Sequence, residues 1–187
     1  MLNQKENDNF NKKQIKIVNQ AAEMAEELVS DYYKLSSSQW LRRRYDIKTL
    51  ADLLPEEIVS GPFAQIIRYK AHLKDSCLGS SAYDFYKICL QDNSILAAIR
   101  DFKAIKLSPF TLYIITHELI HIVRFSEFLQ NFNASHEEKL EEETRVHNST
   151  HEILKSVKLQ GLSNVLKFYH KWCVPVDEFD ELHLQGA

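Results

Sequence analysis

The residues of this chain best suited to chemistry lie in the stretch THELIHIVRF, residues 116–125. His117 and His121 are four positions apart, so on a helix they share one face and can bind one metal ion together. Glu118 is rotated by about 100° from His117, so it can activate a water molecule instead of binding the metal. Catalytic zinc sites use a few imidazole or carboxylate ligands and keep one position open for water. We therefore expect Zn²⁺ here, with Glu118 as the general base of a hydrolase.

A second segment, EEETRVHNSTHEIL at residues 141–154, offers further ligands. Its apolar residues recur at helical spacing, and Glu143 and His147 fall on the same face as these apolar residues. Glu141 and Glu142 lie off this face, so we expect both to point toward solvent. Ionised carboxylates are costly to bury without a partner or a metal. Glu143 and His147 are therefore predicted to join the two histidines of the first segment as metal ligands.

The two segments are predicted to form an antiparallel helix hairpin over residues 109–158. Ser108 and Pro109 can open the first helix, because proline is favoured in a first turn. Ser135 and Glu138 form a capping box that starts the second helix. The candidate ligands then lie at overlapping heights above a turn centred near Asn133: about 12–15 Å for Glu143, about 15–18 Å for His121, about 18–21 Å for His147 and about 21–24 Å for His117.

The motif and its flanks resemble those of the zincin metallopeptidases. Zincins favour uncharged residues around and inside the motif and an apolar residue two places after the second histidine, which here is Val123. The resemblance covers residues 109–158 and implies a zinc peptidase whose substrate is a peptide. In the gluzincin branch the third ligand is a glutamate on a following helix, which corresponds to Glu143. An acidic residue is usual four positions later, where this chain has His147, so this residue is either a fourth ligand or a donor to the transition state.

Two other interpretations of the same residues stay open. The first is a non-hydrolytic helical bundle with iron in place of zinc, since di-iron sites use Glu-x-x-His pairs and Glu118 with His121 makes one. The partner pair, Glu143 with His147, has a spacing of four rather than three, and such sites need further carboxylates. The second is a helical interaction module with a structural metal, in which four protein ligands fill the coordination sphere and exclude water.

The composition indicates a single, mainly α domain. The chain has 187 residues with only four glycines and four prolines, so few positions break long helices. We expect one helical domain over residues 1–187, with residues 1–12 disordered and residues 175–187 forming a tail. The net charge of −3 gives no general attraction to nucleic acid or to an anionic membrane, and we expect neither as a partner.

Two stretches outside the hairpin bear on the fold class. Residues 63–73 have the apolar spacing of a helix. In residues 85–99 the apolar residues share one face of a helix, which is the favoured prediction, but Asp92 and Asn93 could also form the turn of a β-hairpin. The helix gives a mainly α fold, whereas the hairpin gives an α+β fold that retains part of a minimal zincin sheet. Further helices are predicted over residues 15–33 and 162–172.

The remaining features point to a cytoplasmic protein. The three cysteines are widely spaced and form no CxxC pair, which favours reduced thiols. The first residues are polar and lack an apolar signal segment, and no apolar run is long enough to span a membrane. The basic run at residues 42–44 is interpreted as a solvated helix face. The many aromatic residues on amphipathic helices make a homodimer a reasonable expectation.

Overall fold

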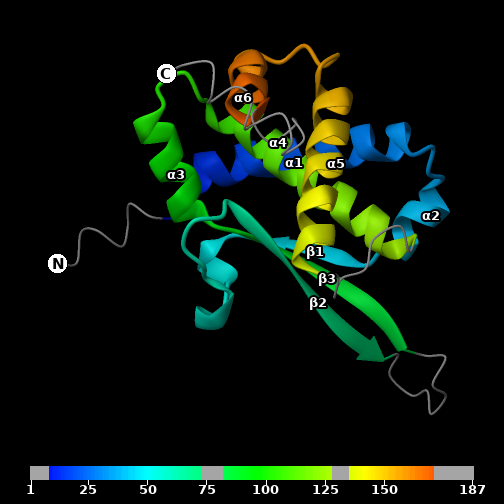
Figure 1. Cartoon of the computed structure of the whole chain (residues 1–187). Helices are drawn as coiled ribbons and strands as arrows, with labels where there is room; N and C mark the ends of the chain where they lie inside the picture. Colours follow the sequence, from blue (N-terminus) through cyan, green and yellow to red (C-terminus); the bar gives the residue numbers. More distant parts are fainter. Residues whose placement is uncertain (1–8, 73–81, 128–134, 171–187) are drawn as a thin grey trace.

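The computed structural model describes residues 9–72, 82–127 and 135–170, and within these ranges the chain is mostly helical with one small sheet (Figure 1). The helices are α1 (Lys12–Tyr32), α2 (Ser37–Arg42), α3 (Asp92–Asp101), α4 (Leu107–Ser126), α5 (His136–Leu154) and α6 (Leu162–Tyr169). The strands are β1 (Tyr45–Lys48), β2 (Ala64–His72) and β3 (Ala82–Leu90), and two 3₁₀ turns, Leu50–Asp52 and Pro55–Glu57, lie between β1 and β2. No described helix is long and apolar enough to cross a membrane.

β3 is the central strand of a mixed sheet with the order β1-β3-β2. β1 pairs with β3 in parallel, whereas β2 pairs with it antiparallel, with Ile66 opposite Ile88. Tyr86, Ile88 and Leu90 alternate along β3, so they point to one face of the sheet, and all three are buried in the core. This face packs on α4, where Tyr86 stacks on Phe125 with 5.9 Å between the ring centroids.

α4 is the central helix of the core. Its residues from Pro109 to Val123 are buried, with Glu118 as the partly exposed exception. A helix that is buried on nearly every side belongs to the interior of a domain, so its polar residues need partners inside the fold. α1 packs along α4 through small or branched side chains that allow a close approach, namely Val18, Ala21, Ala25 and Val29.

Two stretches outside the helix hairpin differ from their predictions. Residues 63–73, predicted as a helix, contain strand β2. Residues 85–99 form neither the predicted helix nor the alternative β-hairpin, because β3 ends at Leu90 and α3 begins at Asp92. β2 and β3 satisfy each other's backbone groups, and a strand's stability depends on its partner more than on its own residues. The pairing of β2 with β3 therefore decides the structure of both stretches, although their apolar residues have helical spacing.

The ends of two helices also differ from prediction. α1 begins at Lys12, and Phe10 is 8% exposed and donates its backbone N–H to Asp92 over 2.9 Å. Residues 9–12 are therefore part of the fold rather than disordered. α5 ends at Leu154, four residues before the predicted end of the hairpin. The predictions for the rest of residues 1–12, for the turn between the two hairpin helices and for the tail at 175–187 lie outside the described residues.

Candidate metal centre

One face of α4 carries four ring-bearing residues at intervals of four, Tyr113, His117, His121 and Phe125. This spacing places them in a row along the helix. His117 and His121 are 8% and 5% exposed, and their Nε2 atoms are 3.2 Å apart. The two imidazoles therefore turn the same nitrogen toward one point.

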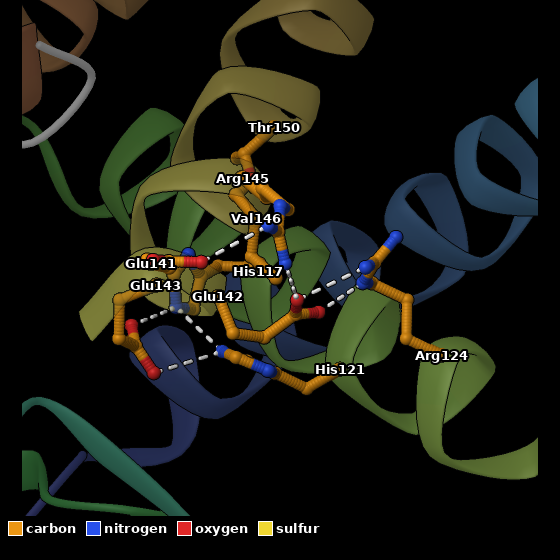
Figure 2. A network of polar contacts seen from close by, with 9 residues as sticks. All are labelled: His117, His121, Arg124, Glu141, Glu142, Glu143, Arg145, Val146 and Thr150. Carbon is orange, nitrogen blue, oxygen red and sulfur yellow. Dashed lines mark hydrogen bonds and ion pairs between the residues drawn. The ribbon is translucent and has the colours of Figure 1, made fainter. Parts of the chain in front are cut away.

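Glu143 of α5 faces these two histidines across the contact between the helices (Figure 2). Its Oε2 lies 3.2 Å from His117 Nε2, and its Oε1 lies 3.2 Å from His121 Nε2. Although desolvation acts to raise it, the contacts with His117 and His121 hold the pKa of the Glu143 carboxyl well below its usual value. The Glu143 side chain is 48% exposed, so the site reaches solvent on this side.

The separations of these donor atoms are close to those between neighbouring ligands of one zinc ion. Zinc binds imidazole nitrogen and carboxylate oxygen at about 2.0–2.1 Å, which gives about 3.3–3.4 Å between neighbouring donors of a tetrahedron. His117 Nε2 lies 3.2 Å from His121 Nε2, and each of these nitrogens lies 3.2 Å from a different oxygen of the Glu143 carboxylate. Imidazole and carboxylate are also donor types that zinc prefers. The structure thus brings together three of the four residues predicted as ligands at a spacing that suits the metal.

The fourth residue, His147, lies one turn after Glu143 and beside the same group. Its ring centroid is 4.3 Å from that of His117, and His117, Glu143 and His147 each place a possible ligand atom within 4.8 Å of one another. Burial, with a contribution from the nearby His117, lowers the pKa of His147 to about 3. The ring is therefore neutral at neutral pH, which is the form that binds metals.

Two buried polar atoms of α4 have no hydrogen-bond partner among the described residues, His117 Nδ1 and Thr116 Oγ1. In metal sites the outer nitrogen of a ligating histidine usually donates to a carbonyl or a carboxylate. The His117 ring lacks that support, so its position depends on packing against His121 and His147, whose centroids are 4.8 Å and 4.3 Å away. Its Nε2 atom is the one that faces the ligand group.

Glu118, the predicted general base, is separated from the ligand face by the helical rotation. It is partly exposed although its neighbours on both sides are buried. Desolvation raises the pKa of its carboxyl, and the nearby His117 and His121 act in the opposite direction. A carboxyl with a raised pKa can take up and release a proton closer to neutral pH.

An ion-pair network lies next to the ligand group and joins α4 to α5 (Figure 2). Glu142 is 3% exposed and accepts hydrogen bonds from Nε and Nη2 of Arg124, while Arg145 bonds both Glu142 and the exposed Glu141. The prediction that Glu142 points toward solvent is wrong, because Arg124 of the facing helix neutralises it inside the contact. This pair fixes the rotation of α5, so that the next residue, Glu143, reaches the histidines.

The contact of Tyr113 with this group was not predicted from the sequence, and its hydroxyl lies 2.8 Å from His147 Nδ1. The sequence spacing could have indicated this contact, because Tyr113 stands four positions before His117 and so lies on the same helix face. The pair Arg124 and Glu142 had no comparable local signal.

Comparisons with protein-family models, with curated proteins and with solved structures find no match for this chain. The interpretation of the site therefore depends on its own geometry and on the chemistry of its residues.

Proposed function

We propose that the protein is a zinc-dependent hydrolase that acts on peptides. The observation that carries the proposal is the convergence of His117 Nε2, His121 Nε2 and the Glu143 carboxylate at separations of 3.2 Å. Two imidazoles and one carboxylate are a ligand set that catalytic zinc sites use, with a further position kept for water. The exposure of Glu143 supports access from solvent to this position.

Glu118 is the general base in this proposal. His117, His121 and Glu143 would hold a zinc ion, which would supply the Lewis acidity that lowers the pKa of water toward about 7. The Glu118 carboxylate would accept a proton from the attacking water and later deliver it to the leaving group. The raised pKa of Glu118 favours the delivery step. Because the helix turns this side chain away from the ligand row, Glu118 acts without occupying a coordination position.

The sheet and the resemblance to zincins support peptides as the substrate class. β2 is an edge strand among the described strands, and an extended peptide can add to such an edge through backbone hydrogen bonds. Phe63, directly before β2, packs edge-on against Phe110 of α4 with 4.9 Å between the centroids. The edge strand is thus anchored to the helix that carries the ligands.

A structural metal site is the second candidate, and the position of His147 favours it. Its neutral ring lies 4.3 Å from that of His117. If His147 fills the fourth position of a tetrahedral ion, water is excluded, and the metal then only holds α4 to α5. The iron alternative has less support, because Glu143 is the one carboxylate in the described ligand group and Asp92 instead accepts two backbone N–H groups.

The substitution Glu118→Gln tests the hydrolase. We expect Glu118→Gln to retain one zinc per chain, measured by elemental analysis, while cleavage of a pool of fluorescence-quenched peptides falls to background. Glu141→Gln, at a side chain that is 68% exposed, is the matched control and should change neither quantity. Equal cleavage by Glu118→Gln and the unaltered protein would contradict the proposal. Zinc that raises the melting temperature of a protein without any hydrolytic activity would support the structural candidate instead.

A further inference from the structure

A buried hydrogen bond links the fourth histidine to α4. The hydroxyl of Tyr113 lies 2.8 Å from His147 Nδ1, and the two residues are 1% and 8% exposed. A hydrogen bond that is shielded from water is stronger than an exposed one, and losing one partner is correspondingly costly. The contact therefore constrains the His147 ring more than a surface hydrogen bond would.

An aromatic stack holds the Tyr113 hydroxyl in place. The rings of Tyr113 and Tyr169 are nearly parallel, at 4°, with 3.9 Å between their centroids. The His147 ring lies 6.0 Å from Tyr113 and 5.6 Å from Tyr169, centroid to centroid. Residues from α4, α5 and α6 thus enclose one ring. Packing and a hydrogen bond to one ring nitrogen together leave an imidazole little freedom to rotate.

We propose that Tyr113 is a positioning residue that orients His147 as the fourth protein ligand of the metal centre. This inference rests on the metal centre of the proposed function and adds His147 to its three ligands. Because Tyr113 engages Nδ1, the nitrogen that His147 presents to a metal is Nε2, at the opposite side of the ring. A ligating Nε2 carries no proton, so Nδ1–H donates to the Tyr113 oxygen. Outer hydrogen bonds of this kind fix the ring of a metal-binding histidine and make it a better ligand.

A fourth protein ligand also changes which coordination position is left for water in hydrolysis. Zinc sites with an open position are usually four-coordinate and sometimes expand to five. With His147 as a ligand, hydrolysis would require a fifth position for water. The exposed side of Glu143 is where the described site reaches solvent. We therefore expect three imidazoles, those of His117, His121 and His147, around the ion.

Zinc affinity tests the inference, measured by competition with a chromophoric chelator. Tyr113→Phe keeps the stacked ring and removes the hydroxyl, and we expect it to weaken zinc binding by about 10- to 100-fold. In a His147→Ala background the same substitution should change nothing further, because Tyr113 acts through His147. Tyr86→Phe, which removes the hydroxyl of a tyrosine that is 4% exposed on β3, is the control and should leave the affinity unchanged.

The outcomes distinguish a failure of the Tyr113 inference from a failure of the metal centre itself. If the unaltered protein binds zinc and Tyr113→Phe binds it equally well, the inference is overturned and the metal centre stands. If the unaltered protein binds no zinc, the metal centre itself is overturned. Should Tyr113→Phe not fold, X-ray absorption at the zinc edge of the unaltered protein decides the question. Three imidazoles around the ion support the inference, and two overturn it.

Discussion

Two clusters of polar side chains differ in composition. One surrounds Glu57, in the 3₁₀ turn beside the sheet, and the other surrounds Glu143, between α4 and α5. Glu57 is 1% exposed, and its carboxylate meets three donors. They are Lys87 Nζ at 2.5 Å, the Tyr69 hydroxyl at 2.7 Å and the backbone N–H of Leu54 at 2.9 Å. The chain itself supplies every partner that this carboxylate needs.

The cluster around Glu143 gathers metal-binding groups in place of donors. The Nε2 atoms of His117 and His121 and the carboxylate of Glu143 approach one another to 3.2 Å, and His117 Nδ1 is buried without a hydrogen-bond partner among the described residues. We propose that a cation completes this arrangement. The contrast teaches that burial of a carboxylate alone does not indicate a candidate site in this protein. The stronger indication is the convergence of several metal-binding side chains from two helices.

Breaking the Glu143 cluster should have the largest effect on metal binding. We expect His121→Ala to lower zinc affinity by more than about 100-fold, because loss of even an outer hydrogen-bond partner costs about 10- to 100-fold. His151→Ala, on α5 but outside the ligand group, is the matched control and should bind zinc like the unaltered protein. Chelator competition measures both. Similar losses in the two variants would show that the zinc is held elsewhere.

The ion pair of Arg124 and Glu142 lies next to the Glu143 cluster. We expect it to stabilise the fold, as the contacts of the Glu57 cluster do. Arg124→Met leaves the buried Glu142 carboxylate without its main partner, which we expect to lower the free energy of unfolding by about 3 kcal/mol. Chemical denaturation of the metal-free protein measures the change. Adding Glu142→Gln to Arg124→Met should recover part of the loss, because it removes the uncompensated charge. A loss below about 1 kcal/mol, typical of exposed ion pairs, would contradict this view of the contact.

The Glu57 cluster should make the free energy of unfolding depend on pH, and we expect this effect to be smaller than the previous two. The hydrogen bond from Lys87 is the main cause that lowers the pKa of Glu57 from 4.5 to about 2. A pKa that is lower in the folded state stabilises the fold above the unfolded pKa, and this stabilisation is lost as the pH falls through the folded pKa. The free energy of unfolding should therefore fall between about pH 4.5 and pH 2, and by less in Glu57→Gln. Glu56→Gln, at an exposed neighbour, should follow the unaltered protein.

Much of the α4–α5 region could be predicted from local signals. Ser135 caps α5 through a capping box with Glu138, and periodicity alone placed Glu143 and His147 on the face that turns toward the histidines. Helix capping and apolar periodicity depend on residues that are close in the sequence, so they can be predicted from a single sequence.

The sheet and the buried Glu142 could not be predicted in the same way. β2 exists because β3 pairs with it along its whole length, and the apolar spacing of that stretch is compatible with a helix as well. Glu142 is buried because Arg124, eighteen residues earlier on another helix, neutralises it. In both cases the deciding partner lies outside the local window, so periodicity pointed to the wrong structure for residues 63–73 and to the wrong exposure for Glu142.

The central claim is that His117, His121 and Glu143 form a binding site for one zinc ion. Calorimetric titration of the metal-free protein with zinc, beside the Glu143→Ala and Glu141→Ala variants, tests it most directly. The account predicts saturation at one ion per chain in the unaltered protein and in Glu141→Ala, and no saturable binding in the same range for Glu143→Ala. No saturable binding in the unaltered protein, or the same binding in Glu143→Ala, would contradict it.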